Sequence, residues 1–219
     1  PFWPKPVTPT TLSLFGFILP QHHSGLAAMG TFSSCLRGCF VLGCQDRPGF
    51  ASVEDVSPLL SVGNRYSAAC GNFEVVVSTV AALDKRGRPW TPGGQVVVPF
   101  DDRWGRESAG QREHARESIL KGVAAVAAAI DDGRRTLVHC EWGQNRSGAI
   151  VCAYAVLCRH WPAQRAVGYV RKRNLAERTY ARQFPMSNAA FNQLMEEFEG
   201  ARAEVARSAG LPNHENLDQ

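Results

Sequence analysis

The sequence predicts an α/β fold with a central, mostly parallel twisted sheet flanked by helices. From about residue 53 onward, short β-branched runs alternate with helical segments, which is the pattern of a sheet covered by helices. The segment 147–161 is apolar nearly all round, so we expect it to be a buried central helix. A tight, glycine-containing loop joins the apolar run TLVHC directly to this segment, as in folds that place a binding loop between a strand and a helix.

The first predicted elements precede this loop. The β-branched run FEVVVSTV at 73–80 predicts a strand, and the turn-rich residues 86–94 separate it from a second strand at 95–100. Residues 116–130 carry apolar side chains on one helical stripe, and DDGRR closes that helix. These segments supply two strands and one amphipathic helix.

The remaining elements follow the loop. TLVHC at 136–140 predicts a buried strand, and the apolar helix over 147–161 ends at Pro162. Two further helices are predicted around 163–173 and 188–200. The second half of the domain is therefore expected to be mainly helical.

A chain of 219 residues suits one domain with additional tails. Residues 1–50 are rich in Pro, Gly, Ser and Thr without a sustained period, so we interpret them as a leader or linker. The folded domain is assigned to 51–200, and 201–219 is expected to be a flexible tail.

Composition argues against several classes of protein. The net charge of +4 is modest, and the arginines are interspersed with acids, which does not indicate a specific nucleic-acid surface. The apolar run at 12–19 is too short to span a membrane. Seven cysteines, an odd number without metal-binding spacing, indicate a reducing compartment and no zinc site. We therefore expect a monomeric chain in the cytoplasm or nucleus that needs no metal or cofactor.

A membrane anchor is expected only if translation begins at Met29. MGTFSSC would then match the myristoylation pattern with Gly30 as the acylated residue, and Cys35 could accept a second acyl chain. If Met29 is internal, no amino terminus exists at Gly30 and the match has no meaning. Membrane association therefore depends on acylation of Gly30.

The candidate site is the stretch TLVHCEWGQNRSG, residues 136–148. A strand, tight loop and helix in this order aim backbone N–H groups and a helix N-terminus at one point, which suits an anion. Gly143 allows a sharp reversal, and Gly148 is expected to let the helix start close to the sheet. The sequence therefore predicts an anion-binding loop over 141–146.

The side chains of this loop suit phosphoryl chemistry. Cys140 would lie beside the N–H dipoles and Arg146, which favour a thiolate and hence a nucleophile. Arg146 can fork two N–H groups onto phosphate oxygens, and Ser147 can hydrogen-bond the sulfur when it leaves.

HCEWGQNRSG resembles the signature of the dual-specificity branch of the cysteine-dependent protein tyrosine phosphatases, and the similarity extends over roughly 53–199. VPFDD at 98–102 resembles the segment that carries the family's general acid, and AYAVLCRHWPAQRAVGYVRKRN resembles its helical stretch. Asn188 and Phe191 match the spacing of its closing helix, whereas Gln193 stands one position early and Arg173-Asn174 replaces an arginine-proline pair. The resemblance implies the phosphatase fold, with its phosphate-binding loop between a strand and the central helix.

The resemblance also implies an activity, namely hydrolysis of phosphotyrosine and phosphoserine or phosphothreonine in proteins through a phosphocysteine. Cys140 would be the nucleophile and Asp102 the general acid, with Asp101 as the alternative acid. His139 would support the loop. The phosphate-binding residues that it implies are Glu141, Trp142, Gly143, Gln144, Asn145 and Arg146. Glu141 and Trp142 are expected to line the mouth of the pocket.

Two other functions remain open. Asn145 resembles the residue before the arginine in RNA 5′-triphosphatases of the same fold, although position 147 is Ser and no basic groove is evident. The domain could instead be a catalytically inactive phosphate-binding scaffold, although the cysteine, arginine and acid are all present. Asn64-Arg65-Tyr66 resembles the phosphotyrosine-recognition loop of the larger tyrosine phosphatases, but it stands in the wrong place for that domain, so we assign it no role.

Overall fold

The fold was examined in a computed structural model that describes residues 49–69, 72–80, 94–102, 109–177 and 185–212. Nearly all of the predicted leader 1–50 lies outside these residues, and so do the two proposed lipidation sites, Gly30 and Cys35.

The described strands form one five-stranded sheet in the order β1-β2-β5-β3-β4. The strands are β1 (Phe50–Ser52), β2 (Leu60–Asn64), β3 (Val75–Ser78), β4 (Gly94–Val97) and β5 (Thr136–Cys140). Only β1 runs antiparallel to its neighbour, and the other three pairings are parallel. The predicted α/β class with a mostly parallel sheet is confirmed. β3, β4 and β5 match predicted strands, whereas the short β1 and β2, which hold Ser and Gly, carried too little apolar pattern to be recognised.

Five α-helices lie among the described residues: α1 (Ala109–Asp131), α2 (Arg146–Cys158), α3 (Ala163–Glu177), α4 (Ala189–Gly200) and α5 (Arg202–Ser208). The first begins ahead of the predicted boundary at 116, because residues 109–114 are exposed and add nothing to the apolar stripe that predicts the helix. A short 3-10 helix, η2 (Ser67–Ala69), follows β2.

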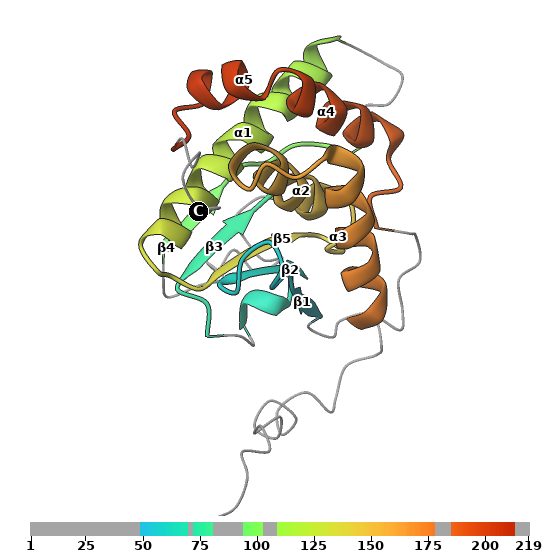
Figure 1. The fold of residues 1–219 in the computed structure, drawn as a ribbon. Coiled ribbons are helices and arrows are strands. Elements are labelled where there is room, and N and C mark those ends of the chain that lie inside the picture. The colour runs from blue at the N-terminus through green and yellow to red at the C-terminus, as the bar shows by residue number, and fades with distance from the viewer. Residues whose placement is uncertain (1–48, 70–71, 81–93, 103–108, 178–184, 213–219) are drawn as a thin grey trace, which may run out of the picture.

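Helix α2 is the centre of the molecule, as its sequence predicts. Every residue from Ser147 to Cys158 is buried. Figure 1 shows α2 between α1, α3, α4 and the sheet, and α1 contacts it through the close approach of Gly122 to Ile150. Burial of an apolar helix on all sides removes a large apolar area from water, which is the main driving force for this packing.

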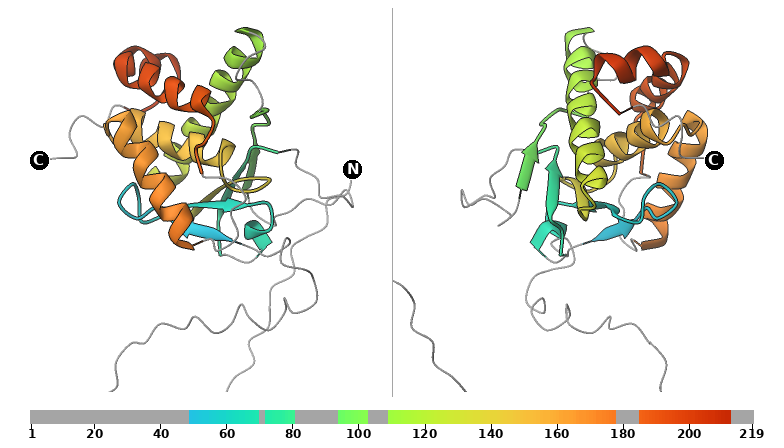
Figure 2. Two further views of the ribbon diagram at one scale, coloured as in Figure 1. Left: turned by 90° about the vertical axis from the view of Figure 1, so that its right-hand side faces the viewer. Right: turned by 60° about the vertical axis from the view of Figure 1, so that its left-hand side comes forward.

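The α-helices cover one face of the sheet, as the two views in Figure 2 show. Leu60, Val62 and Val138 belong to the main core on this side. On the opposite face a small cluster joins Val76 and Leu137 to Ala68 of η2. Alternate strand residues therefore face two cores of very different size, as the two-residue period of a strand requires.

The chain remains folded past residue 200, where the sequence predicts a flexible tail. Residues 202–208 form α5, and Val205 and Leu211 are buried against the main core. The helix is rich in Arg, Ala and Glu, so two apolar anchors give only a weak periodic signal in the sequence. Residues 213–219 lie outside the described part of the chain.

Substitution of Gly63 tests the packing between β2, η2 and β5. A Cβ at this position would lie 2.8 Å from the Ser67 Cβ and 2.9 Å from the Leu137 Cδ1. Gly63→Ala is expected to lower the free energy of unfolding by about 1 to 3 kcal/mol through overpacking, measured by urea denaturation. Gly168→Ala in α3 is the matched control, because its Cβ meets nothing within 4 Å and alanine favours the helix. A stabilising effect of Gly63→Ala would contradict the close packing.

Candidate active site

The candidate site lies where β5 ends and α2 begins. Cys140 is the last residue of β5, and Arg146 is the first residue of α2. Gly143 has a φ of +68°, which confirms the predicted sharp reversal of the loop. Asn145, which precedes α2, makes no side-chain capping bond. The first N–H groups of a helix have no partner within the helix, so a helix N-terminus of this kind suits an anion.

The sulfur of Cys140 has two polar contacts inside this loop. The backbone N–H of Gly143 donates to Sγ over 2.9 Å, and the Ser147 Oγ lies 3.4 Å from the same sulfur. Cys140 is 3% exposed and Ser147 is fully buried. Both contacts place hydrogen-bond donors on the sulfur.

Arg146 connects the loop to the segments that follow β3 and β4. Its Nη1 lies 3.3 Å from the Phe100 carbonyl oxygen and 3.5 Å from that of Thr79. Its Nε lies 4.0 Å from the Asp102 Oδ2. With 17% of its side chain exposed, the guanidinium is directed into the protein beside the loop and not into bulk water.

Asp102 and Asp101, the two candidate acids, differ in their surroundings. The Asp102 carboxylate is half-buried beside Arg146, whereas Asp101 is an exposed residue. The Asn188 Nδ2 donates to the Asp102 carbonyl oxygen over 2.6 Å, and the Asn188 Oδ1 accepts the N–H of Ala190 in the first turn of α4. Asn188 therefore caps a helix and holds the acidic segment at once. Its spacing identified the closing helix, but its contact with Asp102 was not predicted.

The segment before α4 also holds the loop between β5 and α2. The Asn145 Oδ1 accepts the Ser187 N–H over 3.0 Å, and the Gln144 carbonyl accepts the Met186 N–H over 3.4 Å. The Arg171 Nη2 donates to the Met186 carbonyl over 2.6 Å. We call residues 185–188 the brace, because they contact the loop, α3 and the acidic segment together.

The brace also corrects the expectation for Gly148. A Cβ there would lie 3.0 Å from the Met186 Sδ, so the glycine makes room for the brace and not for the sheet. The sequence carried no sign of this contact, because the two residues are far apart along the chain.

His139 is 2% exposed, and its Nδ1 lies 3.5 Å from the Cys140 carbonyl oxygen. Burial lowers the pKa of His139 from 6.5 to about 4, chiefly because the charged imidazolium loses its hydration. His139 is therefore a buried, neutral side chain at physiological pH.

Two further cysteines lie in the core, as predicted. Cys152 and Cys158 are buried in α2. Loss of hydration raises the pKa of Cys158 to about 12 and that of Cys152 further still. Both thiols remain protonated at neutral pH, which makes them poor nucleophiles.

Trp142 and Glu141, which the sequence predicts to line the mouth of the pocket, both have solvent-exposed surface. Among the large apolar residues that the structure describes, Trp142 is the most exposed at 54%, and Glu141 is partly exposed. Gln144 and Asn145 are buried. The Glu141 carboxylate forms an ion pair with Arg65, which follows β2 and was given no role from the sequence.

The described residues also bear on metal binding and on membrane insertion. No group of three or more His, Cys, Asp or Glu side chains in this part of the chain could hold a metal ion. None of its helices is both long enough and apolar enough to span a bilayer.

Comparison with known proteins identifies the family. The family model of the dual specificity phosphatase catalytic domain matches residues 95–200. The putative tyrosine phosphatase 123R of Invertebrate iridescent virus 6 is 31% identical over 127 residues, which cover 58% of this chain and 75% of the viral protein. The chain belongs to the dual-specificity phosphatase family. The match to the protein phosphatase Slingshot of Drosophila melanogaster is 40% identical over 48 residues, covering 22% of this chain and 5% of Slingshot.

Solved structures of dual-specificity phosphatases share the fold. A putative mouse dual specificity phosphatase complexed with zinc tungstate superposes with a TM-score of 0.51 at 24% identity, covering 77% of this chain and 95% of that chain. Human DUSP28 superposes with a TM-score of 0.52 at 23% identity, covering 71% of this chain and 95% of that chain. The predicted family and fold are thereby confirmed.

The buried neutral state of His139 predicts a pH-dependent stability. The unfolded chain takes up a proton near pH 6.5, whereas the folded residue stays neutral down to about pH 4. The free energy of unfolding is therefore unaffected by protonation of His139 above pH 6.5. It falls as the pH is lowered from 6.5 towards 4, by about 3 kcal/mol in all. Urea denaturation across this range is expected to show a shallower decline for His139→Asn than for the unsubstituted protein. Parallel pH profiles of the two proteins would contradict burial of a neutral imidazole.

Proposed function

We propose that this phosphatase hydrolyses phosphate monoesters on protein tyrosine, serine and threonine side chains through a phosphocysteine at Cys140. The observation that carries the proposal is the pair of donors on the Cys140 sulfur, the Gly143 N–H at 2.9 Å and the Ser147 hydroxyl at 3.4 Å. A thiol held in this way beside a helix N-terminus and Arg146 is suited to attack a bound phosphate. The partner is then a phosphorylated protein, and the reaction needs no cofactor.

In the first step the Cys140 sulfur attacks phosphorus, and the bond from phosphorus to the substrate oxygen breaks. Asp102 donates its proton to the departing alcohol or phenol, which avoids release of an unstable oxyanion. Arg146 and the N–H groups of residues 141–146 stabilise the charge on the phosphoryl oxygens as it grows in the transition state. The Arg146 contacts with Thr79 and Phe100 orient the guanidinium for this role.

In the second step the Asp102 carboxylate removes a proton from water, which attacks the phosphocysteine. The bond from sulfur to phosphorus breaks, inorganic phosphate forms, and the thiolate is regenerated. The Ser147 hydroxyl, which already lies on the sulfur, stabilises that leaving thiolate. After one cycle the phosphoryl group has left as inorganic phosphate, and Asp102 has regained from water the proton that it gave to the alcohol or phenol.

The contacts of Asn145 argue against the RNA 5′-triphosphatase alternative. Its side-chain oxygen accepts from the Ser187 N–H, so the carboxamide serves the brace. The residue that suggested an RNA substrate therefore has a structural task in this protein. The inactive-scaffold alternative is distinguished by turnover.

The proposed intermediate is tested with a chromogenic aryl phosphate under reducing conditions. A burst of phenol equal to the enzyme concentration is expected before the steady state if hydrolysis of the phosphocysteine is the slower step. Cys140→Ser is expected to abolish both the burst and turnover, because a serine hydroxyl is not ionised at neutral pH. Cys158→Ser is the control and is expected to keep turnover. Absence of turnover in the unsubstituted protein would favour the scaffold.

The assignment of the general acid is tested by paired substitutions at neighbouring positions. Asp102→Asn is expected to lower kcat by about 100-fold or more, which is typical of losing general acid catalysis. The loss should shrink with an aryl phosphate whose phenol is more acidic, because such a leaving group needs no proton. Asp101→Asn is the matched control and should change kcat little. The opposite pattern would transfer the role to Asp101.

A further inference from the structure

A second pair of charged side chains adjoins the phosphate-binding loop. β2 and β5 run parallel, and their register ends with Asn64 opposite Cys140. Arg65 follows β2 and Glu141 follows β5, so these two residues are neighbours. The Arg65 Nη1 lies 2.5 Å from the Glu141 Oε1, and the Arg65 N–H lies 3.4 Å from the Glu141 carbonyl oxygen.

The turn after β2 fixes Arg65 in this position. The Asn64 Oδ1 accepts the Tyr66 N–H over 3.0 Å, and the Asn64 N–H donates to the Ser67 Oγ over 3.0 Å. The Arg65 guanidinium lies 5.5 Å from the centre of the Tyr66 ring. Its side chain is 16% exposed, compared with 32% for Glu141. The arginine is thus the more buried member of the pair, and the carboxylate is held against it.

A carboxylate at position 141 is unfavourable for the proposed chemistry unless its charge is offset. It follows the nucleophile directly, so its charge opposes both a thiolate at Cys140 and the approach of an anionic phosphate. The two charges of the pair already act in opposite directions on a neighbour, because Glu141 raises and Arg65 lowers the pKa of His139. The field of Glu141 within the loop is thus countered by Arg65.

We propose that Arg65 is a positioning residue of the phosphate site, which holds and neutralises Glu141 so that Arg146 sets the charge of the loop. This inference deepens the proposed function, since it takes residues 140–147 as the phosphate site. Arg65 acts through Glu141 and need not touch the substrate. The role arises from one residue beyond each of two paired strands, and neither residue alone would indicate it.

The charge effect is measured without turnover, by alkylating Cys140 with two reagents. Iodoacetate is an anion and iodoacetamide is neutral. The rate constant for iodoacetate divided by that for iodoacetamide therefore reports the electrostatic potential that an anion meets at the sulfur. Arg65→Met is expected to lower this ratio by about 3-fold, the scale of a partly exposed ion pair. It should weaken protection of Cys140 by inorganic phosphate by a similar factor, and both effects should shrink in 1 M salt.

The reciprocal variants separate charge from packing. Adding Glu141→Gln to Arg65→Met removes the unpaired carboxylate, so the double variant is expected to recover the ratio of the unsubstituted protein. Glu141→Gln alone removes the negative charge beside Arg65 and should raise the ratio by about 3-fold. This single variant keeps the inference testable if Arg65→Met does not fold.

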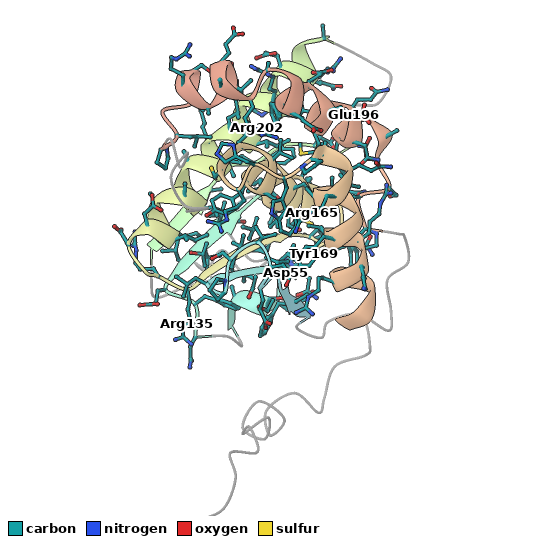
Figure 3. The ribbon with its side chains drawn as sticks, in the orientation of Figure 1. Asp55, Arg135, Arg165, Tyr169, Glu196 and Arg202 are labelled. Carbon is teal, nitrogen blue, oxygen red and sulfur yellow. The ribbon has the colours of Figure 1, made fainter. Side chains whose placement is uncertain are left out.

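Arg135→Met is the matched control. The Arg135 Nε lies 3.9 Å from the Glu74 Oε2. Arg135 precedes β5, at the opposite end of that strand from Cys140. Figure 3 shows its side chain pointing away from the body of the protein. The ratio should not change in this variant.

Three results would overturn the inference: equal slowing of both reagents by Arg65→Met, no recovery in the double variant, or no change in Glu141→Gln. A protein that shows the expected ratios but no turnover of aryl phosphate would refute the proposed hydrolysis and leave the role of Arg65 intact.

Discussion

The hydrogen bond from the Gly143 N–H to the Cys140 sulfur is the interaction on which the rest of the site depends. It forms only because the loop reverses at Gly143 with a positive φ, immediately after a buried strand and before a buried helix. The parallel neighbours of β5 fix where that strand ends, and the packing of α2 fixes where the helix begins. A loop clamped at both ends has its N–H groups oriented before any ligand arrives, so binding an anion requires little reorganisation.

Much of the remaining architecture aligns separate segments with that loop. Arg146 extends from α2 to the carbonyl groups after β3 and β4, and the brace at residues 185–188 bonds to the loop on one side and to Asp102 on the other. Arg171 holds the brace from α3. The candidate nucleophile and the candidate acid thus share a framework of hydrogen bonds, although they lie on different segments. Such a framework suits a reaction in which one carboxyl group must serve two successive steps.

Electrostatics in and around the loop follow from burial and pairing. His139 is kept neutral by loss of hydration, and the thiols of Cys152 and Cys158 are kept protonated by the same effect. Glu141, the one carboxylate within the loop, is paired with Arg65. Cys140 differs from the other two cysteines not by exposure, since it too is buried, but by the donors placed on its sulfur. Local hydrogen bonds therefore distinguish the candidate nucleophile from the two thiols of α2.

The sequence by itself determined the α/β class, the strand and helix that flank the loop, and the motif with Cys140, Arg146 and Ser147, because these features are continuous along the chain and follow local periodicity and turn chemistry. The tertiary structure decided what depends on contacts between distant segments: the brace, the space that Gly148 leaves for Met186, the position of Asp102 beside Arg146, and the pairing of Arg65 with Glu141. Helix α5 also emerged only there, because two buried apolar residues among charged ones give little periodic signal. The residue pattern of a single strand does not specify which other strand lies beside it. The parallel register of β2 and β5 places Arg65 beside the candidate site.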